Sequence, residues 1–399
     1  MSAPLKVGFF LSHPIQYYSP WFRRLAARTD LHVHYFVRQD GGGQARAGFG
    51  VAFEWDLPLL EGYAHRFLRN VARRPSVRGF WNSNTPEVDA ICHEQRFDVA
   101  VVVGWNRLSS WQVIRACRRH GIPVLMRGDS VLRTDRFWML RRMLKFFPYR
   151  AMLRQLDGHL IVGRRNRKYL KFFGVPDAQL HFVPHFVDDE WFAARAREAR
   201  ASGAAAALRH AQGIPATATV GLFCGKLIPK KRVADLIQAL ARLQDIPDLH
   251  LLVAGDGPLR ESLQALARRC APGRVHFLGF RNQTELPACY AAADFLALPS
   301  GPDETWGLVA NEAMACGLPV LLSQRVGSVS DLVTPGETGD SFPSGNIPAL
   351  TGRMRTLVDD LRRDRTRIQA AVAARIAQYS VAAATDATLE AFYRVARRN

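Results

Sequence analysis

Several features that mark particular classes of protein are scarce or missing in this sequence. Its 399 residues include only six cysteines, scattered without a C-x-x-C pair, which argues against a disulfide framework or a zinc site and favours free thiols in a reducing compartment. No run of 18 apolar residues occurs, so we expect no membrane-spanning helix. The apolar run near the start is too short for a secretory signal, and we expect a cytoplasmic protein.

Acidic residues are also few relative to basic ones. The chain has 54 Lys and Arg against 35 Asp and Glu, a formal net charge of +19, and residues 1–200 carry +15 of it (32 basic against 17 acidic). Such a field attracts anionic lipid, phosphorylated substrates or nucleic acid. Alternatively, the excess is compositional, because Arg greatly outnumbers Lys, and the charges are simply solvated.

Short apolar runs alternate with helical patterns along most of the chain. Uninterrupted runs of Val, Leu, Ile and Phe suit strands that are buried on both faces of a parallel sheet, and the repeated alternation predicts a doubly wound α/β fold. The runs expected to be strands are 6–11, 32–37, 98–103, 123–126, 159–162, 180–183, 218–224, 249–254, 275–278, 295–298 and 319–322. They suffice for two Rossmann-like domains that face each other across a cleft.

An Ala- and Arg-rich stretch indicates the boundary between the two domains. We expect an N-terminal Rossmann-like domain at 1–190, a helical connector at 191–215 and a C-terminal Rossmann-like domain at 216–380. Residues 381–399 form one more amphipathic helix, which we expect to cross back to the first domain.

A loop rich in lysine follows the first expected strand of the second domain. Gly225 begins it, and Lys226 and Lys231 stand just before a helix that opens at Val233. A helix N-terminus beside two cations predicts a phosphate site, because unsatisfied N–H groups and positive charge act together. The alternative is a solvated basic turn.

The stretch GPDETWGLVANEAMACGLPV contains two glutamates eight positions apart, Glu304 and Glu312. Glu312 shares a helix face with Leu308 and Cys316, and a carboxylate on an apolar face is costly unless hydrogen bonds are donated to it. Sugar hydroxyls are candidate donors; the alternative is a carboxylate in water on the helix surface. Gly307 would let a phosphate approach the backbone.

These motifs together resemble the donor domain of the GT-B-fold retaining glycosyltransferases of family 4, also known as glycosyl transferases group 1. Glu304 and Glu312 match the family's pair of glutamates, and Lys226 and Lys231 match its pair of basic residues. Residues 255–258, 277–280 and 326–333 agree with further family motifs in order and spacing.

The resemblance implies a nucleoside-diphosphate sugar as donor and a role for each matched residue. Lys226 and Lys231 would neutralise the diphosphate, Glu312 would hold the ribose, and Glu304 would hold and help transfer the donor sugar. The nucleobase would lie beside Phe280 and Asn282, and the remaining donor contacts would come from Thr305, Trp306, Gly307 and Leu308. Because no D-x-D sequence occurs, we expect no metal and no other cofactor.

Candidate acceptor residues lie in the first domain. His13, Gln16 and Tyr17 follow its first strand, where most of the family have a glycine-rich loop, and both aromatic packing and an acceptor role remain open for Tyr17. Arg127 and Asp129 follow its fourth strand, where many relatives have a histidine. Asp129 would act as the acceptor-side base, or Arg127 would bind phosphate.

Residues 136–154 mix aromatic and aliphatic side chains with cations, which is typical of a segment at an anionic membrane interface, although two ordinary amphipathic helices explain the pattern equally well. The function that the sequence favours is retaining sugar transfer to a glycan or lipid-linked glycan in cell-surface polysaccharide or glycolipid synthesis, with no specific nucleic acid as partner. The alternatives are a nucleotide-sugar epimerase or a phosphorylase on a similar fold, and then a non-catalytic membrane or nucleic-acid binder.

Overall fold

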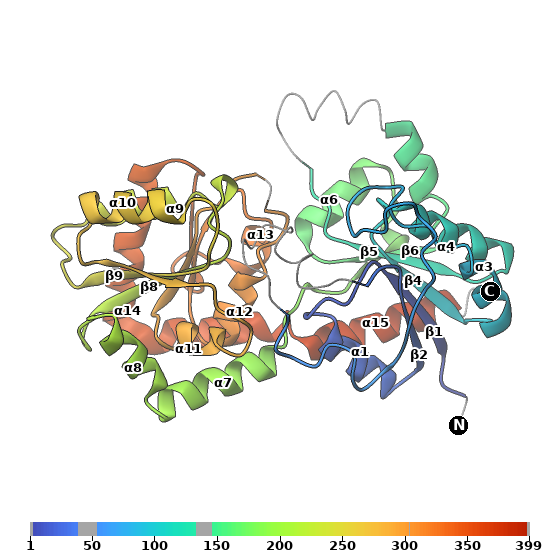
Figure 1. The fold of residues 1–399 in the computed structure, drawn as a ribbon, viewed down its shortest axis with the longest axis horizontal. Coiled ribbons are helices and arrows are strands. Elements are labelled where there is room, and N and C mark those ends of the chain that lie inside the picture. Colours follow the sequence, from blue (N-terminus) through green and yellow to red (C-terminus); the bar gives the residue numbers. More distant parts are fainter. Residues whose placement is uncertain (1–2, 39–53, 133–145, 303, 397–399) are drawn as a thin grey trace. The chain divides into compact units, whose positions relative to one another are not determined.

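The computed structural model describes residues 3–38, 54–132, 146–302 and 304–396, and these form two compact units. Of the described residues, 3–38, 58–132, 146–185 and 381–396 make up the first unit, and 54–57, 186–302 and 304–380 make up the second. Each unit contains one parallel sheet flanked by helices (Figure 1). The predicted doubly wound α/β fold with two sheets is therefore confirmed.

The first sheet has seven strands in the order β3-β2-β1-β4-β5-β6-β7. They are β1 (Lys6–Leu11), β2 (Asp30–Tyr35), β3 (Ala64–Phe67), β4 (Val99–Val103), β5 (Val124–Gly128), β6 (Gly158–Ile161) and β7 (Leu180–Phe182). The described helices of this unit include α1 (Ser19–Ala26), α3 (Val88–Gln95), α4 (Leu108–Arg119), α6 (Arg164–Phe172) and α15 (Val381–Ala396), and residues 146–153 are helical as well.

Side-chain alternation along β1 builds a core on both faces of the first sheet. Phe9 contacts Trp21 and Phe22 of α1 and Phe392 of α15, whereas Phe10 packs into the core beneath α3 and α4. Because α15 follows the second unit in sequence but contacts α1, the chain returns to the first unit at its end.

The second sheet has six strands in the order β10-β9-β8-β11-β12-β13. They are β8 (Thr219–Cys224), β9 (Leu249–Ala254), β10 (Val275–Gly279), β11 (Phe295–Leu298), β12 (Val320–Ser323) and β13 (Gly339–Phe342). In Figure 1, α9 (Val233–Ala241) and α10 (Arg260–Cys270) cover one face, and α11 (Leu286–Ala291) and α12 (Val309–Ala315) cover the other. The remaining helices are α7 (Asp189–Ala201), α8 (Ala204–Ala211), α13 (Val329–Leu332) and α14 (Ile347–Ala377).

The segment expected to be a connector, 191–215, lies inside the second unit. It forms most of α7 and all of α8, which pack against α11 and α12. Arg209 donates to the carbonyl of Ala292 at 2.7 Å and pairs with the buried carboxylate of Asp294 at 2.9 Å. These contacts explain why an Arg-rich stretch with few large apolar residues is nonetheless part of a domain.

All six cysteines are free thiols, as expected. Among the described helices, none combines the length and the apolar character needed to span a membrane.

Candidate active site

The lysine-rich loop and the two-glutamate stretch meet at one edge of the second sheet. β8 pairs with β9 on one side and with β11 on the other, so the order of strands reverses between β8 and β11. In open parallel sheets, ligands bind beyond the carboxyl ends of the strands at such a switch point. The two loops follow these two strands and therefore lie at this position.

The loop after β8 is fixed against the loop after β9 by backbone contacts. Leu227 N donates to Asp256 O at 2.8 Å, and a Cβ atom on Gly255 would lie 1.9 Å from the carbonyl oxygen of Gly225. Glycine is therefore required at position 255 by backbone packing. Lys226 lies half-buried in this loop, and Lys231 ends a short 3-10 turn, Pro229–Lys231.

The structure brings Lys231 and Glu304 together as an ion pair. Lys231 Nζ lies 2.5 Å from Glu304 Oε2, and the two side chains are only 11% and 13% exposed. The loops that carry them are joined through their backbones as well, because Gly301 N donates to Lys230 O at 2.8 Å. A cation and a carboxylate are thus held at the switch point in a largely buried position.

Glu312 is buried in α12, with an exposure of 1%. The hydroxyl of Tyr290 on α11 donates to Glu312 Oε2 at 2.6 Å. Burial raises the pKa of Tyr290 well above its ordinary value, and the nearby Cys224 and Glu312 raise it further, so this hydroxyl remains a donor. The alternative of a solvated surface carboxylate is excluded. The sequence did not single out Tyr290, since nothing in its spacing links it to Glu312.

Trp306 does not present its ring to a ligand in this structure. It is 4% exposed, its Nε1 donates to Asn311 Oδ1 at 2.8 Å, and its ring lies 6.1 Å from that of Tyr379. The side chain therefore belongs to the core of the second unit. The donor contact expected around Trp306 is made by backbone N–H groups, and it stays a prediction.

Gly307 is required by the conformation and packing of its loop. Its φ is +87°, and a Cβ atom there would lie 2.9 Å from Leu298 Cδ2. The approach of a phosphate to this backbone stays a prediction. The neighbouring Thr305 and Leu308 are half-buried, and Gly327 N donates to Glu304 O at 3.0 Å, which fixes the loop that carries Glu304.

The residues predicted to flank a nucleobase lie in the loop between β10 and α11. Phe280 is half-buried, and Asn282 forms the turn: its Oδ1 accepts from Gln283 N at 2.9 Å. Asn282 Nδ2 donates to Glu54 O at 2.8 Å, so a segment from the distant sequence region 54–57 packs onto this loop. Both polar atoms of the amide are therefore engaged by protein groups.

In the first unit, the loops after β1 and β4 meet at the corresponding reversal of strand order. A hydrogen bond of 2.8 Å joins His13 Nδ1 and Ser12 Oγ. Burial, and secondarily the charge of Arg107 at the start of α4, lowers the pKa of His13 to about 4, so this imidazole is neutral near pH 7. Gln16 and Tyr17 are half-buried in the same loop, and Asp129 is half-buried after β5.

Arg127 is a buried structural cation and not an accessible phosphate ligand. It has no exposed surface, it donates to the carbonyls of Val183 and Pro184 at 3.0 Å each, and its guanidinium lies 4.9 Å from the centre of the Trp21 ring. Burial lowers its pKa. The prediction that Arg127 binds phosphate is therefore wrong, since its donors hold the segment after β7 in place.

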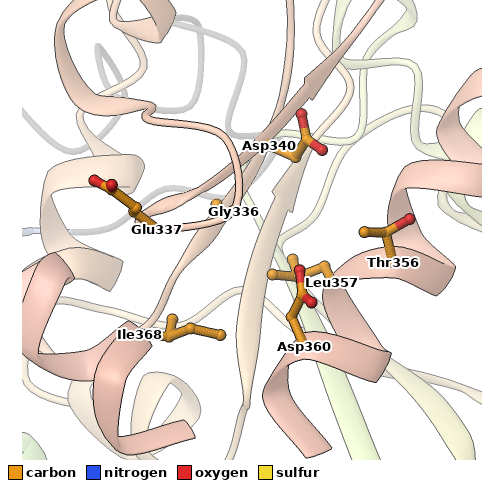
Figure 2. A pocket seen from close by; sticks show the side chains of 8 residues that line it. Gly336, Glu337, Asp340, Thr356, Leu357, Asp360 and Ile368 are labelled. Atoms are coloured by element: carbon orange, nitrogen blue, oxygen red, sulfur yellow. The ribbon is translucent and has the colours of Figure 1, made fainter. Parts of the chain in front are cut away.

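The second unit also contains a small hollow lined by acidic residues, which is separate from the candidate donor site. Figure 2 shows Glu337, Asp340 and Asp360 around a pocket of about 10 Å³, a volume that holds no sugar. It adjoins Gly339, the first residue of β13, and therefore lies near the amino ends of the strands, whereas the loops after β8 and β11 lie at the carboxyl ends.

Known proteins similar to this chain are glycosyltransferases. The profile of the family described as "Glycosyl transferases group 1" matches residues 205–373. A GDP-mannose-dependent alpha-(1-6)-phosphatidylinositol dimannoside mannosyltransferase from Mycobacterium tuberculosis is 34% identical over 269 residues, covering 66% of this chain and 66% of that protein. A D-inositol 3-phosphate glycosyltransferase from Corynebacterium efficiens is 40% identical over 170 residues. That alignment covers 40% of this chain and 39% of that protein, so the matches span two thirds of these relatives or less.

Solved structures with a similar fold cover nearly the whole chain. A glycosyltransferase from Rickettsia africae has a TM-score of 0.73 at 13% identity and covers 99% of this chain and 100% of its own. Anabaena Alr3699/HepE in complex with UDP has a TM-score of 0.72 at 18% identity, covering 98% and 100%. At such identities the likeness shows the fold, which is the two-domain GT-B architecture.

Proposed function

Because this chain belongs to the group 1 glycosyltransferases, we propose that it transfers a sugar from a nucleoside-diphosphate sugar to a hydroxyl of a glycan or lipid-linked glycan. The observation that carries this proposal is the ion pair of Lys231 and Glu304 at the switch point between β8 and β11. Lys226 lies in the same loop as Lys231, and Glu312 lies in α12, the helix that follows the loop of Glu304. We further propose that the sugar keeps its anomeric configuration and that the product belongs to cell-surface polysaccharide or glycolipid synthesis.

The ion pair between Lys231 and Glu304 would be rearranged by the donor. Without a ligand, the two charges stabilise each other at 2.5 Å. A diphosphate that approaches Lys231 offers it a stronger partner, because charge-assisted hydrogen bonds to phosphate oxygens involve more negative charge than one carboxylate. Glu304 would then turn to the hydroxyls of the donor sugar.

The lysines also account for the chemical step. The bond from the anomeric carbon to the diphosphate oxygen breaks, so negative charge grows on the leaving diphosphate. Cations held beside that charge lower the barrier, and we propose that Lys226 and Lys231 do so without a metal ion once the donor has replaced Glu304 as the partner of Lys231. The acceptor hydroxyl would attack the anomeric carbon from the face that the diphosphate leaves, so that the configuration is kept, and would lose its proton, with Asp129 in the first unit as our candidate base.

Glu312 would hold the ribose through a carboxylate already oriented by Tyr290. The bond from the tyrosine hydroxyl fixes Oε2, and burial makes each further hydrogen bond to the carboxylate stronger than it would be in water. We place the nucleobase near Phe280. We also propose that the protein acts at the cytoplasmic face of an anionic membrane, where lipid-linked acceptors are found.

Thermal unfolding with a panel of nucleoside diphosphates and nucleotide sugars, with and without magnesium, tests the donor site. The panel includes GDP-mannose, because a relative is named as dependent on it. We expect one base to raise the melting temperature without magnesium, by mass action on the folded state. No shift with any ligand would overturn the proposal.

The two glutamates should differ in a second experiment. Glu312→Gln should weaken nucleotide binding, whereas Glu304→Gln should leave it nearly intact and lower turnover, measured as nucleoside diphosphate released with an acceptor present. Equal loss of nucleotide binding in both variants would contradict these roles.

A further inference from the structure

An exposed loop of the first unit combines an aromatic side chain with several arginines. Residues 71–81, VARRPSVRGFW, lie between β3 and α3. Trp81 is 72% exposed and Val71 is 46% exposed, and Arg73 and Arg74 beside them are exposed as well. Large apolar side chains that stay in water among cations mark a contact surface when they gather in one segment.

The fold holds this loop in place. Val71 N donates to Asn84 O at 2.8 Å, and Ser76 N donates to Asn82 O at 3.0 Å. Backbone hydrogen bonds thus join the beginning and the middle of the loop to the residues that follow it. Leu108 N, at the first residue of α4, donates to Phe80 O at 3.0 Å. The loop therefore presents Trp81 to solvent from a fixed position.

The surface continues from the loop onto α4. Gln112 Nε2 donates to Asn84 Oδ1 at 2.8 Å, and Gln112 also lines a groove of about 440 Å³ along α4. The other side chains lining that groove are Leu108, Trp111, Ile114, Arg115, Arg118 and Gln155. Apolar and cationic groups thus continue past the loop.

Negative charge is missing from both segments. Residues 62–86 contain five arginines and no Asp or Glu, and residues 99–128 contain another five and again no Asp or Glu. In the part of the chain that the structure describes, none of Arg73, Arg74, Arg115 and Arg118 forms an ion pair. These cations are available to an anionic partner.

We propose that residues 71–81, together with the exposed face of α4, form a docking surface for an anionic lipid bilayer. Trp81 and Val71 would enter the headgroup region, where Trp is favoured, and the arginines would lie over anionic headgroups. The surface differs from the predicted segment 136–154, of which 136–145 lie outside the described residues. This inference deepens the proposed function, since it names the surface through which the enzyme would reach a lipid-linked acceptor.

Vesicle flotation tests the surface directly. Vesicles of phosphatidylcholine alone are compared with vesicles in which one lipid in four is phosphatidylglycerol. We expect the protein to bind the anionic vesicles only, Arg73→Glu/Arg74→Glu to lower that binding at least about tenfold, and Trp81→Ser to lower it severalfold.

Two matched controls separate a specific surface from general attraction. Arg268→Glu/Arg269→Glu reverses two exposed, adjacent arginines on α10 of the second unit and changes the net charge equally, and Tyr393→Ser removes another exposed aromatic side chain, 44% exposed, from the first unit. We expect both controls to bind like the parent protein. Equal losses in controls and test variants, or salt-dependent binding to DNA without binding to vesicles, would overturn the proposal.

A cooperative thermal unfolding transition without ligand, measured on every variant, shows that each one is folded. The rise in melting temperature that nucleotide adds keeps the two proposals apart. A protein that binds nucleotide but no anionic vesicle refutes the docking surface alone, whereas one that binds vesicles but no nucleotide refutes the proposed donor site alone.

Discussion

Replacing Lys231 by methionine should separate the structural part of its ion pair from the catalytic part. Lys231 Nζ and Glu304 Oε2 are 2.5 Å apart in a site where both side chains are nearly buried. With an effective dielectric constant of about 20, the attraction between unit charges at that distance is about 7 kcal/mol before desolvation is subtracted. Removing one partner of a buried pair costs about 3–5 kcal/mol, and because the side chains keep 11% and 13% exposure, we expect about 3 kcal/mol of unfolding free energy to be lost.

The double variant Lys231→Met/Glu304→Leu should recover most of that loss. Replacing both charges by apolar groups of similar volume leaves no unpaired carboxylate, so its unfolding free energy should return to within about 1 kcal/mol of the parent protein. Activity should not return with it. Loss of one donor aimed at developing charge lowers kcat by about 10²–10³-fold, so both variants should be nearly inactive.

Urea denaturation and initial rates, measured where every variant is folded, check this prediction. Lys230→Met is the control, because it removes an exposed lysine from the same loop and should change the unfolding free energy by less than about 0.5 kcal/mol. Recovery of turnover in the double variant would refute the reasoning, since the pair would then serve the fold alone.

Three further predictions concern buried groups. Burial lowers the pKa of His34 and of His159 to about 4, so the unfolded chain binds more protons than the folded one between pH 6.5 and pH 4. The free energy of unfolding should therefore fall across that range by up to about 3 kcal/mol for each histidine, seen as a lower urea midpoint, and a flat pH profile would contradict this. Arg127→Met should lower the unfolding free energy by about 2–4 kcal/mol, because two buried carbonyls lose their donor, without changing the KM for the acceptor. Gly255→Ala should weaken nucleotide binding and stability together, because its Cβ would overlap the carbonyl oxygen of Gly225, and calorimetric titration that finds unchanged affinity would refute that.

The apolar runs predicted eleven of the strands to within about two residues, because strands buried on both faces need such runs. The two missed strands, β3 and β13, read AHRF and GDSF and lie at sheet edges. An edge strand can carry polar residues, so composition alone does not reveal it. That residues 191–215 belong to the second unit was missed for a related reason. Arg209 attaches α8 to that unit through hydrogen bonds, and hydrophobic periodicity does not reveal such bonds.

For the site, spacing along the chain predicted which loops meet but not where each side chain points. Lys231 and Glu304 follow neighbouring strands, and parallel topology alone brings them together. Trp306 and Arg127 also follow strands, yet both point into the interior, and Tyr290 reaches Glu312 from another helix. Side-chain direction depends on the packing of distant elements, which one sequence does not display.

Calorimetric titration of the parent protein, Lys231→Ala and Lys230→Ala with UDP and GDP tests where the donor binds. We expect the parent protein and Lys230→Ala to bind one of the two diphosphates with similar affinity, and Lys231→Ala to bind it at least about tenfold more weakly. Undiminished affinity in Lys231→Ala, or no binding of either diphosphate by the parent protein, would contradict the placement of the donor site at the switch point.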